Sequence, residues 1–127
     1  MDPRTAAGAY REAAFENAPP IKIVRMLYSG ALRFLDQAAA EPAGGLGSRY
    51  AYLLMRADSI VAELRLALLK EHAPDVAANL EQLYLFVEDR LRAAMREQNK
   101  AHISDARKVL ANLLEAWSQV ELTSRAS

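Results

Sequence analysis

Hydrophobic residues recur at intervals of three and four positions along most of this chain, in four long stretches that short polar breaks separate. This spacing places the apolar residues of each stretch on one side of an α-helix. The chain shows none of the strict apolar–polar alternation that is typical of β-strands. The pattern therefore predicts α-helices over about residues 20–41, 48–70, 74–98 and 102–122.

Turn-forming residues occupy the breaks between these stretches. The first break reads EPAGGLGS, and its last residue, Ser48, suits the N-cap of the second helix because its hydroxyl can accept a backbone N–H. In the second break, KEHAPD, Pro74 and Asp75 suit the first turn of the third helix. Because such short breaks join long helices, consecutive helices should pack antiparallel.

We therefore expect an all-α fold, an antiparallel up-down four-helix bundle, over residues 19–122. Residues 1–18 are expected to form a short, mobile N-terminal flap, and residues 123–127 a disordered tail. The flap has only Tyr10 and Phe15 as large apolar side chains, too few to hold a short helix in water by itself. These two side chains are candidates to cover an apolar surface of the bundle.

The first long helix carries more apolar surface than one core-facing stripe requires. Its apolar positions sweep an arc of roughly 180°, whereas a helix that packs on one core needs a stripe of about 100° or a little more. One interpretation is that neighbouring helices cover the whole arc. The other is that Ile21, Val24, Tyr28 and Leu32 line a groove that receives a partner.

Two further helices have apolar residues outside their core-facing stripes. In the second helix Met55 and Leu66 lie opposite the stripe, and in the third Leu85 and Phe86 lie among charged residues. Surplus apolar residues on three helices indicate a binding groove or an interface, so these four residues are candidate partner-binding residues. Trp117, by contrast, falls on the apolar face of the last helix and is expected to be buried.

Composition narrows the classes of partner. The formal net charge is zero, so the chain lacks the positive excess on which phosphate-backbone binding depends, and we expect no nucleic-acid partner. No apolar run approaches ~18 residues, so no membrane insertion is expected. The N-terminus has no apolar signal-peptide segment, which predicts a cytoplasmic protein.

The sequence offers few residues for catalysis or metal binding. Cysteine is absent, and His72 and His102 lie at helix boundaries without a second histidine at ligand spacing. Glu88 and Arg92 are expected to form an exposed ion pair one helical turn apart rather than an acid–base pair. We therefore expect no catalytic residue, no metal and no cofactor, and a protein that is not an enzyme.

The order of its motifs resembles that of the flagellar export chaperone FliS family. The chain reads YREAAFENAPPIKIVRMLYSGALRFLDQA from Tyr10 to Ala38, ADSIVAEL from Ala57, VAANLEQLYLFVEDRL from Val76, and LLEAW ending at Trp117. In the family, a tyrosine precedes a Thr-Ala-Ser-Pro-like turn and a Met-Leu-Tyr-Asp/Asn-Gly helix, and a tryptophan ends the last helix. The resemblance covers nearly the whole chain.

The resemblance implies a helical bundle that binds flagellin in the cytoplasm. Such a protein holds the disordered C-terminal segment of flagellin, prevents premature polymerisation and delivers the client to the flagellar type III export gate. The N-terminal segment of the family covers part of the apolar binding surface when the client is absent. In this mode of recognition the apolar groove of the chaperone binds a client segment, which becomes ordered as a helix when it binds.

Two alternatives stay open at this point. The surplus apolar faces would also suit a self-associating bundle, that is, a homodimer. They would equally suit a regulatory protein that sequesters a regulator of flagellar genes. Binding of a flagellin C-terminal peptide separates the chaperone from the homodimer, whereas the regulator requires a second partner that competes for the same surface.

Overall fold

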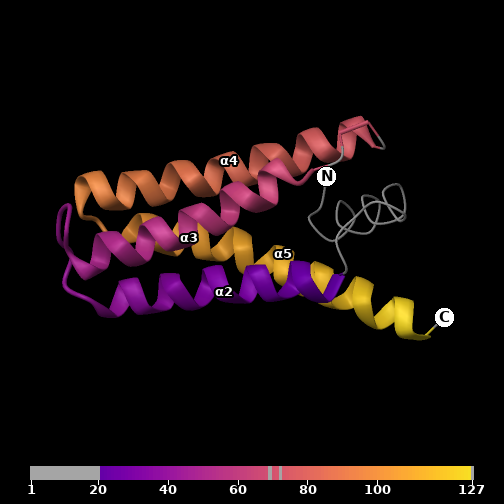
Figure 1. The fold of residues 1–127 in the computed structure, drawn as a ribbon, viewed down its shortest axis with the longest axis horizontal. Coiled ribbons are helices and arrows are strands. Elements are labelled where there is room, and N and C mark those ends of the chain that lie inside the picture. Colours follow the sequence, from indigo (N-terminus) through magenta and orange to yellow (C-terminus); the bar gives the residue numbers. More distant parts are fainter. Residues whose placement is uncertain (1–20, 69, 72, 127) are drawn as a thin grey trace.

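The computed structural model describes residues 21–126 except 69 and 72, with side chains as far as residue 119. The helices of this part of the chain are α2 (Ile21–Ala40), α3 (Arg49–Leu66), α4 (Pro74–Glu97) and α5 (Ala101–Ala126). They run back and forth side by side, joined by short connections (Figure 1). Over the described range, no residue belongs to a strand.

Each helix packs against two neighbours, and the four close into a ring in cross-section. α2 contacts α3 and α5, and α4 contacts the same two helices from the other side. α2 and α4 are therefore diagonal to one another, as are α3 and α5. The predicted all-α, antiparallel up-down bundle is confirmed.

The helix ends lie close to their predicted positions, with two differences. α3 ends at Leu66, and just beyond it the backbone N–H of Leu68 donates to the carbonyl of Arg65, three positions back, instead of continuing the helical spacing of four. α5 continues to Ala126, beyond the expected end near residue 122. No helix of the described part is long and apolar enough to cross a bilayer.

Local interactions explain where two helices begin. The Ser48 hydroxyl accepts the backbone N–H of Ala51 at 3.1 Å, so the predicted N-cap of α3 is confirmed. Pro74 occupies the first turn of α4, where its missing N–H costs nothing, and Asp75 places a negative charge at the same helix end. The bundle thus uses the start signals that the sequence displays.

Aromatic and aliphatic side chains of all four helices fill the core. Trp117 is only 4% exposed, so its predicted burial is confirmed. The Tyr50 hydroxyl crosses from α3 to donate to the carbonyl of Ala94 on α4 at 2.8 Å, which satisfies a polar group inside the core. The largest fully buried side chains are those of Tyr28, Tyr50, Tyr84, Leu35, Leu53, Leu54, Leu80, Leu91, Leu110 and Leu113.

Candidate partner-binding surface

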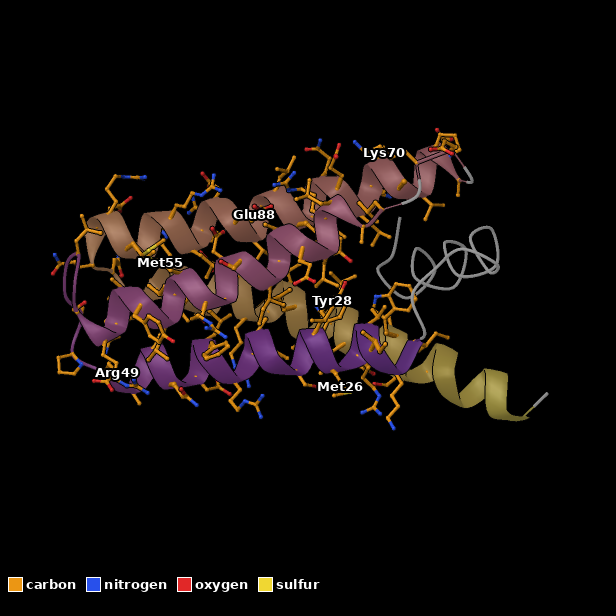
Figure 2. The ribbon with its side chains drawn as sticks, viewed as in Figure 1. Met26, Tyr28, Arg49, Met55, Lys70 and Glu88 are labelled. Carbon is orange, nitrogen blue, oxygen red and sulfur yellow. The ribbon has the colours of Figure 1, made fainter. Side chains whose placement is uncertain are left out.

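Three of the predicted partner-binding residues border one surface, along the line where α3 and α4 pack together. Met55 and Leu66 on α3 are 51% and 76% exposed, and Leu85 on α4 is 41% exposed. We call the surface that Met55, Leu66 and Leu85 border the α3–α4 surface. Figure 2 shows Met55 and Glu88 along this line between the two helices.

Helical periodicity places these side chains beside the residues that join α3 to α4. Met55 precedes Asp58 by three positions, and Asp58 faces Arg92 across the two helices. Leu85 precedes Arg92 by seven positions, or two turns, and so lies on the same side of α4. Leu66 follows Met55 by eleven positions, or three turns, and so lies on the same side of α3.

A buried ion pair lies beneath this surface. Arg65 donates from Nε and Nη2 to the two carboxylate oxygens of Glu88, at 2.7 and 3.2 Å. Glu88 is 1% exposed, and Arg92 lies 3.7 Å from it. The prediction of an exposed Glu88–Arg92 pair is therefore wrong for Glu88. Its position one turn after Tyr84, on the core-facing side of α4, is the sequence signal that indicates burial.

Asp58 has the least satisfied carboxyl group of this network. Its Oδ1 atom is buried without a hydrogen-bond partner, and its nearest cationic contact is Arg92, with 3.9 Å between Oδ2 and the guanidinium. Burial raises the pKa of Asp58, and the charge of Glu88 raises it further, while Arg92 and Arg65 act in the opposite direction. An incompletely paired carboxylate thus lies under the α3–α4 surface.

Phe86 does not belong to this surface. It is 44% exposed, and the guanidinium of Arg90 lies 5.9 Å from the centre of its ring. Arg90 also contacts His102 of α5 at 3.1 Å, which places both Arg90 and Phe86 on the α5 side of α4. The structure therefore separates Leu85 and Phe86, which are adjacent in the sequence, onto different sides of one helix.

The residues predicted to line a groove on α2 are mostly inside the bundle. Val24 and Leu32 are 8% and 9% exposed, and Tyr28 is fully buried. The physical reason is the ring arrangement, since α3 and α5 cover α2 from two sides and absorb most of its wide apolar arc. The expectation that these three side chains lie on an open surface is therefore wrong. The other interpretation, in which neighbouring helices cover them, is correct.

Tyr28 takes part in a buried polar cluster instead. Its hydroxyl contacts the Tyr84 hydroxyl and accepts the indole N–H of Trp117 at 3.3 Å. The Tyr84 side chain is buried as well, at 2% exposure. Burial, then the charge and hydrogen bond of Tyr84, raise the pKa of Tyr28 well above its ordinary value, so the hydroxyl stays protonated.

A shallow groove of about 530 Å³ runs between α2 and α5. Arg107 of α5 donates to Asp36 of α2 at 2.7 Å, and this exposed pair borders the groove. Leu32 is among the residues that line this groove, although it is only 9% exposed. The groove is lined by Ser29, Leu32, Arg33, Asp36, Gln37, Ala40 and Leu114.

The remaining predicted residues are placed as follows. Ile21 is half-buried at the start of α2, whereas Tyr10 and Phe15 lie outside the described residues. The sequence interpretation did not single out four exposed apolar side chains as partner-binding: Ile23, Met26, Leu46 and Tyr52. Tyr52 precedes Met55 by three positions, a spacing that could have extended the predicted surface.

The described residues show little that could hold a metal ion. Among them, no group of three or more histidine, cysteine, aspartate or glutamate side chains comes together. His102 lies between Glu97 and Arg90, at 3.1 Å from each, and the proximity of the imidazole to Glu97 lowers the pKa of that carboxyl. His72 lies outside the described residues. The described residues therefore offer apolar contacts and ion pairs on their surface.

Comparison with known proteins gives a consistent result. The model of the family described as flagellar protein FliS matches residues 3–124. The chain is 30% identical over 121 residues to the flagellar secretion chaperone FliS of Vibrio cholerae, covering 92% of this chain and 89% of the relative. It is 32% identical over 120 residues to the flagellar secretion chaperone FliS of Campylobacter jejuni, covering 94% of each chain.

A third relative of the same name, from Salmonella typhimurium, is 29% identical over 110 residues, which cover 86% of this chain and 82% of the relative. The family match spans almost the full sequence, and each relative is covered over more than four-fifths of its length. The resemblance carried by the sequence motifs is therefore confirmed. This chain belongs to the FliS family of flagellar secretion chaperones, which are not enzymes.

Proposed function

We propose that this protein binds the C-terminal segment of flagellin in the cytoplasm, prevents its premature polymerisation and delivers it to the flagellar type III export apparatus. Membership of the FliS family supports a role as a secretion chaperone. The proposal that it binds a client is supported by the α3–α4 surface, where Met55, Leu66 and Leu85 expose apolar side chains from two adjacent helices. Such a patch on a small protein is typical of a partner-binding site.

A disordered client segment suits this surface. A segment that orders on binding can place an amphipathic helix across two packed helices and bury their exposed apolar side chains. The ordering of the segment opposes binding, so affinity depends on a few well-buried apolar contacts. Leu66, at 76% exposure, has the most surface to bury among the three.

The test is a calorimetric titration of the full chain with a peptide of the C-terminal segment of flagellin from the same organism. Leu66→Asp should weaken binding by at least about tenfold, which corresponds to ~1.4 kcal/mol. The matched control is Leu46→Asp, since Leu46 is 95% exposed in the α2–α3 connection, away from the α3–α4 surface. Loss of binding by both variants or by neither would contradict the proposed site, and no binding by the unchanged protein would contradict the function.

The N-terminal residues Tyr10 and Phe15 keep a proposed role as competitors of the client. If the N-terminal segment occupies the binding surface, the apparent affinity for the client falls in proportion to the fraction of molecules in which that surface is open. Deletion of residues 1–16 should therefore tighten the peptide complex in the same titration. Equal affinities of the full and shortened chains would contradict this competition while leaving client binding intact.

A further inference from the structure

Asp58 lies between the exposed apolar side chains that border the α3–α4 surface. On α3 it follows Met55 by three positions and precedes Leu66 by eight, and its carboxylate faces Arg92 of α4. Met55 and Leu66 are eleven positions apart, which corresponds to about 16 Å along the helix axis. A helix that rests on both of these side chains and on Leu85 of α4 therefore passes over Asp58.

The Asp58 carboxylate keeps limited access to water. Its side chain is 21% exposed, and its Oδ1 atom is buried without a hydrogen-bond partner. Because Oδ1 is buried, the water that hydrates this carboxylate reaches it through Oδ2. Arg92 does not replace that water, since its Nη2 atom lies 3.9 Å from Oδ2, beyond the distance of a hydrogen bond. A ligand on the α3–α4 surface would therefore cover the hydrated side of an incompletely paired charge.

Glu88 takes the larger share of the positive charge nearby. Arg65 donates from Nε and Nη2 to its two carboxylate oxygens, at 2.7 and 3.2 Å. The Nη2 atom of Arg92 lies 3.7 Å from Glu88, slightly closer than it lies to Asp58. Exclusion of water would strengthen the attraction between Asp58 and Arg92. That contact is long and is shared with Glu88, so it offsets only part of the cost of covering the Asp58 charge.

The charged groups around Asp58 come from α3 and α4. Burial is the largest cause of its raised pKa, while Arg92 lowers that pKa, Glu88 raises it and Arg65 lowers it. α2 packs against another side of α3, at Ile60, which lies about 200° around the helix from Asp58. α5 lies diagonally across the bundle from α3. Burial already outweighs the neighbouring cations, so further burial of the carboxylate acts in the same direction.

We propose that binding of the client segment to the α3–α4 surface is coupled to the uptake of a proton by Asp58. This rests on the proposed function and adds a form of regulation at the same site. An apolar client face laid over Met55 and Leu66 removes the remaining water from the carboxylate. The charged form loses more by this than the neutral form does, so the complex favours the protonated carboxyl.

The direction of the pH dependence follows from linkage. The pKa of Asp58 is higher in the complex than in the free protein, so the complex holds more protons over the interval between the two values. The extra affinity is fully present below the pKa of the free protein and is lost as the pH rises through the pKa of the complex. Acidification from neutral pH therefore favours client binding, and a rise in pH favours client release.

The test is a calorimetric titration of the full chain with the flagellin C-terminal peptide, in pairs of buffers with different ionisation enthalpies, which gives the number of protons taken up. The peptide has titrating groups of its own, so Asp58→Asn serves as the reference. The unchanged protein should take up more protons per complex than Asp58→Asn. Between about pH 7 and pH 5 its affinity should rise by at least about threefold more than that of the variant. Asp58→Ala repeats the comparison with a second side chain that cannot be charged.

The matched control is Asp105→Asn, which makes the same chemical change at an exposed carboxylate on α5, the helix diagonal to α3. It should take up as many protons as the unchanged protein. Equal proton uptake by the unchanged protein and both Asp58 variants, or an equal decrease in Asp105→Asn, would overturn the coupling and leave client binding intact. A peptide that binds at no pH would contradict the proposed function and this inference with it.

Discussion

The hydroxyl of Tyr28 on α2 contacts the hydroxyl of Tyr84 on α4, across the diagonal of the bundle. The two rings are tilted by 44°, with 6.4 Å between their centres. Trp117 of α5 donates its indole N–H to the same Tyr28 oxygen. One buried polar cluster thus joins three helices, two of which, α2 and α4, do not otherwise pack together.

Tyr84→Phe should destabilise the protein by about 1–3 kcal/mol, because the buried Tyr28 hydroxyl would lose one of its two hydrogen-bond partners. The Tyr28 hydroxyl accepts from Trp117 and would lose its contact on α4, with no water to replace it. Urea unfolding followed by circular dichroism measures the change. The combined Tyr28→Phe and Tyr84→Phe variant should cost less than the sum of the two single variants, and strict additivity would show that the hydroxyls do not interact.

Trp117→Ala should cost about 3–5 kcal/mol, as expected for removing a large buried aromatic side chain. The cavity would open beside Tyr28, whose hydroxyl would also lose the indole donor. Urea unfolding measures this loss of stability. Because Trp117 is the single tryptophan, iodide quenching of the unchanged protein gives an independent check. Strong quenching, or a loss below about 1 kcal/mol, would show an exposed side chain.

The fold was largely predictable because each helix carries its own local signals. Periodic apolar residues mark α2 to α5, Ser48 caps α3, and Pro74 begins α4. These signals act within one or two turns, so they can be recognised without knowledge of the neighbours. The early end of α3 at Leu66 was not predictable, because apolar residues continue beyond it while the backbone already turns at Ala67.

The candidate site was predictable only in part. Met55 and Leu66 lie opposite their own core stripe, so one helix suffices to predict their exposure, as the structure confirms. Val24 and Tyr28 lie at the edge of a wide arc, and their burial depends on two neighbours, α3 and α5. Periodicity within α2 cannot define how closely those neighbours approach. Contacts between helices therefore decide whether such residues are buried or exposed, which the sequence of a single helix leaves open.

Leu32→Asp and Leu66→Asp should differ sharply in their effect on folding. Leu32 is 9% exposed, and a carboxylate there would lose water without gaining a partner, so the variant should lose more than about 3 kcal/mol. Leu66 is 76% exposed, and its variant should stay within about 0.5 kcal/mol of the original. Thermal unfolding of both variants decides the matter. A stable Leu32→Asp protein would show that α2 presents this side chain to an open groove.

Arg65→Ala should destabilise the bundle by about 2 kcal/mol, because it leaves the buried Glu88 carboxylate without its bidentate partner. The cost should lie below the ~3–5 kcal/mol of fully buried pairs, since Arg65 is partly exposed and Arg92 remains 3.7 Å from Glu88. Replacing Arg92 instead, as Arg92→Ala, should cost less, because its contacts are longer and it is largely exposed. Urea unfolding compares the two. An equal loss would show that the buried geometry of Arg65 adds nothing.

Asp58→Asn should stabilise the protein at neutral pH. Burial raises the pKa of Asp58, which means that the folded state holds this proton at a higher pH than the unfolded chain does. A raised carboxyl pKa contributes stability that is fully present below the unfolded value and is lost as pH rises through the folded value. At neutral pH the ionised carboxylate therefore opposes folding, and a neutral amide of the same shape removes that penalty.

The advantage of Asp58→Asn should shrink as the pH falls from 7 through the raised pKa of Asp58 toward the ordinary value of 3.8. Over this interval the carboxyl of the unchanged protein takes up its proton and comes to resemble the amide, since the charge of Arg92 offsets the effect of burial only in part. Urea unfolding of both proteins across this pH range measures the difference in free energy of unfolding. An advantage that stays constant with pH, or a variant less stable at pH 7, would show that Arg92 and Arg65 outweigh the burial of the Asp58 carboxylate.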